Sequence, residues 1–288
     1  LVGLFLAFDG RLTMGTVSTA ASMANFVITP CHQIAQCWAK VKSSQGIRQR
    51  LEAAMAEPQA TEQGEPIGHI DSIQCETVRF AYPNTAEPVL KDASLTVDAA
   101  QKVALVGESG CGKSTLAKLL FQYYPDYSGD ILFNGRQVRT LDRTALYRRV
   151  GYIAQTAYLF HDTIRNNICL HEDFPDEQLA HAIAAAGLTD WVASLPDGLD
   201  TVISENGKNL SGGQRQRIGI ARLALRSYDL IIADEITASL DPDTSQQVME
   251  NLIAMPCMVV AITHDVAGSF MHQFDKVYRV EHGVVRVA

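Results

Sequence analysis

One glycine-rich segment limits what this chain can fold into more than any other feature. Residues 107–114 read Gly-Glu-Ser-Gly-Cys-Gly-Lys-Ser, which matches the phosphate-binding pattern G-x-x-x-x-G-K-[ST]. The run 102–106 before it predicts a buried parallel strand, and residues 115–120 after it have helical character. The alternative is a glycine-rich turn that binds nothing, but the flanking strand and helix favour a phosphate loop. We therefore predict an α/β protein of the P-loop NTPase class.

Each residue type in this loop suits the binding of a nucleotide. The glycines permit backbone conformations in which N–H groups face an anion, and the start of the following helix adds the positive end of its dipole. Lys113 would reach the β- and γ-phosphates of ATP, and the Ser114 hydroxyl would ligate Mg²⁺. The predicted ATP contacts in the loop are Gly107, Glu108, Ser109, Gly110, Cys111, Gly112, Lys113, Ser114 and Thr115.

An acidic pair follows a second apolar run. Residues 230–233 predict another buried strand, and Asp234 and Glu235 stand at its end. Ligands of open α/β sheets bind at the carboxyl ends of the strands, so Asp234 would hold Mg²⁺ and Glu235 would polarise an attacking water. Alone, the pair could be two acids at a strand end. The phosphate loop makes the functional interpretation the favoured one.

A third motif points to one branch of the P-loop proteins. Residues 210–214 read Leu-Ser-Gly-Gly-Gln, and with the two motifs above the chain resembles the ATP-binding cassette (ABC) family, whose signature this segment matches in all five positions. Ser211 would cap a helix, and the two glycines would leave its N–H groups bare. The resemblance implies that this helix end faces the γ-phosphate held by a second chain, through Ser211, Gly212, Gly213 and Gln214.

The resemblance implies further site residues, in the family's order along the chain. Gln155 would contact Mg²⁺ and water, Asp241 would lie in a loop that crosses the dimer interface, and His264 would contact the γ-phosphate. Tyr82 would stack on adenine, and packing at a strand end is its alternative role. The catalytic set is then Glu235, His264 and Gln155, and the metal set is Ser114, Gln155 and Asp234.

The resemblance covers residues 70–288 as a nucleotide-binding domain with a mixed core sheet, a small antiparallel sheet and a helical subdomain. The residues themselves predict several of its parts: antiparallel strands over 74–80 and 94–98, hairpin turns at Asn134-Gly135 and His282-Gly283, and a helix over 176–186.

The N-terminal segment has a different composition. No Asp, Glu, Lys or Arg occurs from Leu12 to Ala39, a stretch longer than the roughly 20 residues that span a bilayer. We predict that residues 1–56 end a transmembrane domain, with part of one helix, an outer turn and a last membrane helix, and that 57–69 form a linker. Because the chain begins at Leu1, we expect it to be the C-terminal piece of a longer polypeptide. The alternative is a buried or amphipathic helix of a soluble protein.

Composition excludes some functions. The net charge of −8, from 24 basic and 32 acidic residues, argues against nucleic acid as a partner. The six cysteines include no C-x-x-C pair, so we expect free thiols and no zinc site.

Together these features predict the C-terminal part of an exporter-type ABC transporter, a multi-pass protein of the cell membrane with its cassette in the cytoplasm. The expected cofactors are ATP and Mg²⁺. The expected partners are membrane lipid, a transported substrate and a second cassette-bearing chain, in a homodimer or a heterodimer. One rival is a soluble ABC-type ATPase with a mechanical role. The other is a regulatory ATP-binding subunit with little turnover, against which intact Glu235 and His264 argue.

Overall fold

Two compact units make up the chain. The computed structural model describes residues 5, 10, 13–56, 64–83, 85, 87–237, 240–263 and 270–288. The contacts divide it into Leu1–Ala60 and Thr61–Ala288. The assignment of a membrane segment, a linker and a cassette to particular residues stays a prediction.

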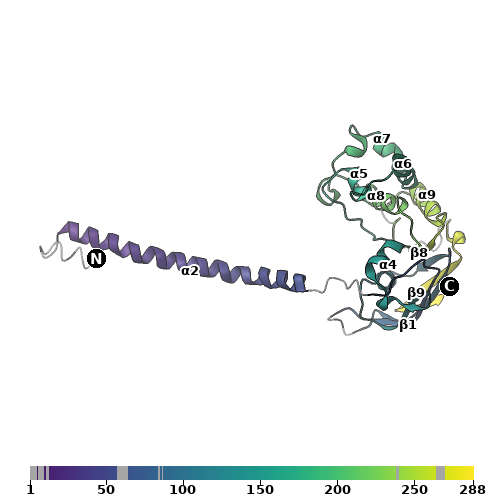
Figure 1. Ribbon diagram of the computed structural model, residues 1–288, viewed down its shortest axis with the longest axis horizontal. Coiled ribbons are helices and arrows are strands. Elements are labelled where there is room, and N and C mark those ends of the chain that lie inside the picture. Colours follow the sequence, from purple (N-terminus) through teal and green to yellow (C-terminus); the bar gives the residue numbers. More distant parts are fainter. Residues whose placement is uncertain are drawn as a thin grey trace. The chain divides into compact units, whose positions relative to one another are not determined.

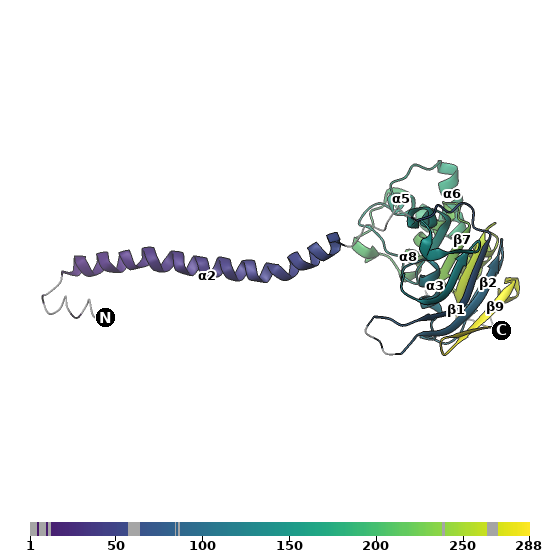
Figure 2. The same cartoon turned by 60° about the horizontal axis from the view of Figure 1, so that its bottom comes forward.

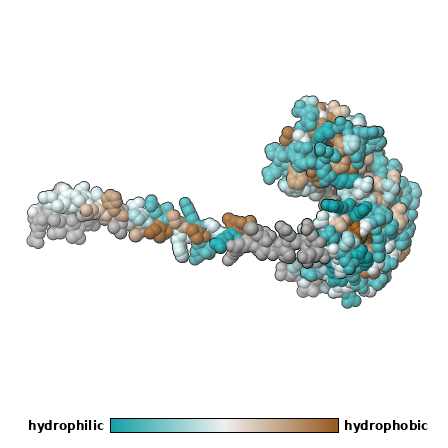
Figure 3. All heavy atoms as spheres, in the orientation of Figure 1, coloured by the Kyte–Doolittle hydropathy of each residue, from teal (hydrophilic) through white to brown (hydrophobic). Residues whose placement is uncertain are grey.

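The first unit contains one long helix, α2 (Met14–Ala56), with Pro30 inside it (Figure 1). Phe26, Ile34 and Trp38 on this helix are exposed. Figure 3 shows apolar and polar side chains next to one another along its visible face. Among the described residues, no helix combines the length and the apolar character that crossing a membrane requires. The membrane helix expected within residues 1–56 stays a prediction.

A sheet forms the frame of the second unit. Within the described residues it has ten strands, which lie side by side in the order β5 (Arg136–Gln137), β4 (Ser128–Phe133), β1 (Ser72–Phe80), β2 (Leu90–Asp98), β10 (Val284–Val287), β9 (Lys276–Glu281), β3 (Lys102–Val106), β8 (Met258–Thr263), β7 (Leu230–Asp234) and β6 (Val150–Ile153).

The sheet has a parallel part and an antiparallel part. Strands β9, β3, β8, β7 and β6 are parallel neighbours. Strands β2, β1 and β4 pair antiparallel, as predicted from residues 74–80 and 94–98. The two parts join where Val284 of β10 pairs with Asp92 of β2. The small antiparallel sheet is therefore continuous with the core sheet.

Both predicted hairpin turns are present. Asn134 and Gly135 have φ angles of 51° and 74° and connect β4 to β5, and His282 and Gly283 have φ angles of 49° and 81° and connect β9 to β10. Two consecutive left-handed residues give a turn whose twist matches that of the flanking strands.

The second unit also contains helices, some of which pack on the sheet while others pack on one another. They are α3 (Lys113–Leu120), α4 (Arg143–Arg149), α5 (Ile164–Cys169), α6 (Asp176–Ala185), α7 (Thr189–Ala193), α8 (Gly212–Ala224) and α9 (Pro242–Ile253), with 3₁₀ turns at Val138–Thr140, Gly198–Asp200, Glu205–Gly207 and Met271–Gln273. Val103 and Leu105 pack in one core cluster with residues of α3, and Ala104 and Val106 pack in another with residues of α8 and α9. Central parallel strands are thus buried on both faces, as this kind of sheet requires.

A helical group stands apart from the antiparallel strands. Helix α8 packs against α5 and α6. In Figures 1 and 2, α5 and α6 gather at the end of the second unit away from β1. The helix predicted over 176–186 is α6, and its packing with the signature helix forms the expected helical subdomain.

The segment before β1 is tied to the second unit. The Glu65 N–H donates to the Thr140 carbonyl at 2.8 Å, and the Asp142 N–H donates to the Glu65 carbonyl at 2.9 Å. Ile67 and Ile70 are buried. This unit therefore takes in the C-terminal part of the predicted linker, and residues 57–63 lie outside the described residues.

Candidate functional site

Two glycines allow the phosphate loop to leave β3 and enter α3. Gly112 caps the start of α3 with a φ of 112°, and a Cβ there would lie 2.8 Å from Leu90 Cδ2. Gly107 has a φ of 150°, and a Cβ there would lie 2.3 Å from the Val280 carbonyl oxygen. Any side chain at either position would strain the backbone and collide with the neighbouring strand, so the loop requires glycine at both.

Hydrogen bonds from Lys113 stabilise the phosphate loop. Lys113 is buried, and its Nζ donates to the carbonyl oxygens of Gly107 and Glu108, each at 2.8 Å. Two neutral carbonyls do not neutralise an ammonium group. Its positive charge therefore stays at the loop, where a phosphate would bind.

Two of the predicted metal ligands are in contact. The Ser114 Oγ donates to Asp234 Oδ1 at 2.8 Å. The sheet explains the contact, because β8 alone separates β3 from β7 and all three strands run parallel. The end of β7 and the start of α3 therefore meet at the same edge of the sheet.

The predicted catalytic glutamate pairs with the predicted glutamine. Gln155 Nε2 donates to Glu235 Oε2 at 2.9 Å. Glu235 has a φ of 52°, and its N–H donates to the Ile262 carbonyl at 3.2 Å. A left-handed backbone is uncommon for a residue with a side chain and is typical of functional sites. This conformation turns the chain away from β7 directly after Asp234.

Tyr82 stands next to the loop. Its hydroxyl lies 2.8 Å from Thr115 Oγ1, and its ring makes edge contacts with Phe80 and Tyr124 at centroid distances of 5.1 and 5.6 Å. Tyr82 therefore both packs against neighbouring aromatic rings and lies beside the phosphate loop. Stacking on adenine stays a prediction.

The signature segment begins a helix, as predicted. Ser211 is the N-cap of α8: its Oγ accepts the Gln214 N–H at 3.1 Å, and Gln214 Oε1 accepts the Ser211 N–H at 2.9 Å. Ser211 and Gly212 are exposed. Across the described part of the chain, no hydrogen bond joins residues 211–214 to the phosphate loop. This helix end is therefore accessible to another molecule.

Asp241 caps the next helix. Its carboxylate accepts the Thr244 N–H at 3.0 Å at the start of α9, and this backbone hydrogen bond lowers the pKa of Asp241. The role at a dimer interface stays a prediction. His264 lies outside the described residues.

Two residues that the sequence did not single out reach this site. The Tyr152 hydroxyl donates to Asp234 Oδ2 at 3.1 Å. Burial, and next the Asp234 carboxylate, raise the pKa of Tyr152, so the hydroxyl stays protonated. Gln216 of α8 is buried, and its Nε2 donates to the Glu235 carbonyl at 3.2 Å. Their positions in the sequence were the only signal, since Tyr152 lies three residues before Gln155 and Gln216 lies two residues after Gln214.

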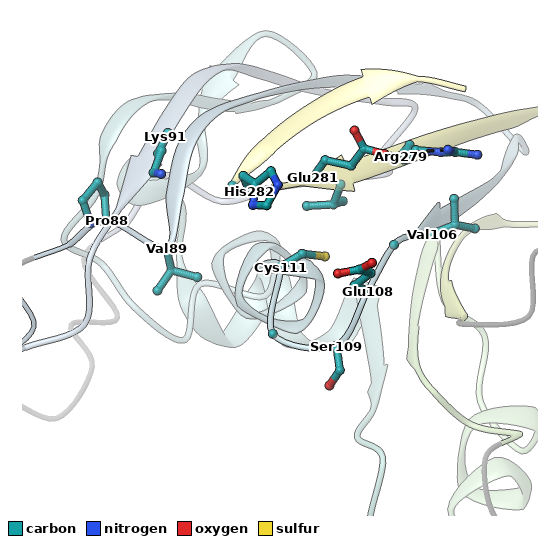
Figure 4. A pocket seen from close by; sticks show the side chains of 14 residues that line it. Pro88, Val89, Lys91, Val106, Glu108, Ser109, Cys111, Arg279, Glu281 and His282 are labelled. Atoms are coloured by element: carbon teal, nitrogen blue, oxygen red, sulfur yellow. Dashed lines mark ion pairs between the residues drawn. The ribbon is translucent and has the colours of Figure 1, made fainter.

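A cavity of about 900 Å³ lies between the phosphate loop and the β9–β10 hairpin. In Figure 4 the Cys111 and Glu108 side chains lie on one side of it and Glu281 and His282 of the β9–β10 hairpin lie on the other. Strand β9 flanks β3 on the side away from β8 and β7. The lining of the cavity includes residues 107–111, which are predicted ATP contacts, and does not include Ser114, Asp234 or Glu235.

Comparisons with known proteins agree with this arrangement. The profile of the family described as ABC transporter matches residues 90–238. The chain is 33% identical over 280 residues to the ATP-dependent lipid A-core flippase of Salmonella typhimurium, and 32% identical over 278 residues to that of Escherichia coli K12. Each alignment covers 95% of this chain and 48% of the relative.

A solved structure is also similar. The structure of a bacterial Atm1-family ABC exporter with ATP bound superposes with a TM-score of 0.76 at 27% identity, over 96% of this chain and 49% of that one. The chain thus spans about half the length of the relatives that it matches. Both kinds of similarity extend over the N-terminal segment as well as the phosphate-loop unit.

Proposed function

Since the chain belongs to the ABC transporter family, we propose that residues 70–288 bind MgATP and hydrolyse it, and that the hydrolysis drives transport across a membrane. The observation that carries this proposal is the gathering of four polar side chains at one edge of the sheet. Ser114 contacts Asp234, and Gln155 contacts Glu235, one residue further along the chain. This set combines a metal site with a base, as nucleotide hydrolysis requires.

The donor set fits Mg²⁺. Ser114 and Asp234 offer hard oxygen ligands, and Gln155 would add an amide oxygen. Among the described residues, no group of three or more His, Cys, Asp or Glu side chains could hold a metal. Mg²⁺ usually takes one or two protein carboxylates and completes its shell with water and nucleotide phosphates, and Asp234 would supply one such carboxylate. When bound, the metal would neutralise negative charge that develops on the phosphates.

The chain's own groups would carry the remaining chemistry. Glu235 would accept a proton from the attacking water, whose oxygen forms the new bond to the γ-phosphorus while the bond to the ADP oxygen breaks. Lys113 and the loop N–H groups would stabilise the charge on the transferred phosphoryl group. His264 would contact the γ-phosphate, and Tyr82 would support the adenine.

A second cassette would complete the site. Ser211 and Gly212 are exposed at the capped start of α8, so the signature residues would serve the ATP held by a partner. Two equivalent sites favour a homodimer, and a related chain in a heterodimer is the alternative. ATP would then close the pair, and hydrolysis with product release would reopen it.

The N-terminal segment would connect this cycle to a membrane. Residues 1–56 would form the end of a transmembrane domain, with the cassette in the cytoplasm and membrane lipid around the helices. The relatives are a flippase and an exporter, and the alignments reach into this segment, which favours an exporter over a soluble ATPase.

Concentration dependence tests the paired arrangement. We expect phosphate release from MgATP by the purified chain to rise faster than linearly with protein concentration, because two chains must meet to form one site. The measurement is the initial rate over a hundredfold dilution series. A rate per chain that stays constant while the protein is monomeric by light scattering would rule out the shared site.

A further inference from the structure

Both carboxylate oxygens of Asp234 have a donor within this chain. Ser114 donates to Oδ1 at 2.8 Å, and Tyr152 donates to Oδ2 at 3.1 Å. Asp234 is 5% exposed, so water contributes little to holding its side chain. The two hydrogen bonds therefore fix which oxygen lies on the side of Ser114 and which faces β6.

Tyr152 itself is held firmly. It lies in β6, in register with Ile232 of β7, two residues before Asp234. Its ring packs against Phe121 at a centroid distance of 5.2 Å, and Phe121 stacks on Tyr147 at 4.7 Å. Because the Tyr152 ring packs against Phe121 and its hydroxyl is hydrogen-bonded to Asp234, the hydroxyl has little freedom to move.

We propose that Tyr152 is a positioning residue for Mg²⁺: its hydroxyl holds one oxygen of Asp234 so that the other stays directed to the metal beside Ser114. Groups that hydrogen-bond to a metal ligand fix its orientation, and their loss typically weakens metal binding about 10- to 100-fold. This inference rests on the proposed function, because it assigns Asp234 to Mg²⁺.

If Tyr152 served only to pack the core, the Tyr152→Phe variant would respond to Mg²⁺ as the wild type does. Phenylalanine keeps the ring and its contact with Phe121 and removes only the hydroxyl. A packing role would therefore leave Tyr152→Phe unchanged in its response to metal. A positioning role would change that response specifically.

The test compares Tyr152→Phe with Tyr147→Phe in the full chain. Tyr147 belongs to the same aromatic stack and is 40% exposed, which makes it a matched control. For Tyr152→Phe we expect the Mg²⁺ concentration for half-maximal ATP hydrolysis to rise at least about 10-fold, with the rate at saturating Mg²⁺ nearly restored. Tyr147→Phe should behave as wild type.

A binding measurement gives a second readout without turnover. Titration with a fluorescent ATP analogue should show that Mg²⁺ tightens binding less in Tyr152→Phe than in wild type, while affinity in EDTA and the thermal unfolding temperature stay the same. An unchanged Mg²⁺ dependence in both assays would overturn the proposal and leave the ATPase function intact. A wild-type chain that hydrolyses ATP without any divalent cation would instead overturn the proposed metal site.

Discussion

Replacing Glu235 with glutamine is expected to reduce ATP hydrolysis by a factor of about 10² to 10⁴, the usual contribution of a general base. Glutamine has nearly the same shape and keeps an oxygen that can accept the Gln155 amide hydrogen bond of 2.9 Å. The left-handed backbone at this position is also unchanged. What glutamine lacks is the ability to take a proton from the attacking water.

The measurement is phosphate release at saturating MgATP, together with ATP affinity by equilibrium titration. Affinity should stay within a few-fold of wild type, because Lys113 and the loop are untouched. Glu250→Gln is a matched control, since Glu250 in α9 also accepts a glutamine amide, from Gln246 at 2.8 Å. If Glu235→Gln kept most of the wild-type rate, another group would have to be the base.

The second large effect is expected from Lys113→Ala, which should weaken ATP binding by about 10- to 100-fold and abolish most hydrolysis. A hydrogen bond to a charged group contributes about 1.5–3 kcal/mol, which corresponds to an affinity change of this size. The substitution also removes the donor to the Gly107 and Glu108 carbonyls, so the loop loses these two stabilising hydrogen bonds.

Equilibrium titration with ATP measures this effect, and thermal unfolding separates it from a loss of folding. Lys118→Ala, on the same helix and half-buried, changes the net charge equally and should bind ATP as wild type does. Wild-type affinity in Lys113→Ala would mean that the loop does not hold the phosphates.

The sequence predicted the strands, the turns and the capped signature helix because these features depend on local patterns. The loop glycines, the hairpin turns at Asn134 and His282 and the Ser211 cap each require particular residue types at particular spacings. The structure brings the predicted pairs Ser114 with Asp234 and Gln155 with Glu235 together at the ends of parallel strands.

The remaining features depend on contacts between distant segments. The hydrogen bond from Tyr152 to Asp234 follows from the register of β6 on β7, and the bond from Gln216 to Glu235 follows from how α8 packs. The pairing of Val284 with Asp92, which joins the two parts of the sheet, is equally non-local. Hydrophobic periodicity carries no information about such registers.

Mixing two inactive variants tests the central claim most directly, that each ATP site is shared between two cassettes. Glu235→Gln lacks the base but keeps its signature. Gly212→Glu keeps its base but places a carboxylate at the exposed start of α8. A negative charge there interacts favourably with the helix dipole, so the helix should still form, but it would repel a bound phosphate. A mixed pair would contain one site with both an intact base and an intact signature.

We predict that each variant alone is nearly inactive and that the mixture regains hydrolysis. Recovery should grow with the fraction of mixed pairs, and a mixture of Glu235→Gln with Glu235→Gln,Gly212→Glu should stay inactive. If the Gly212→Glu variant alone hydrolyses ATP at the wild-type rate, or if mixing restores nothing although mixed pairs form, the shared site is contradicted.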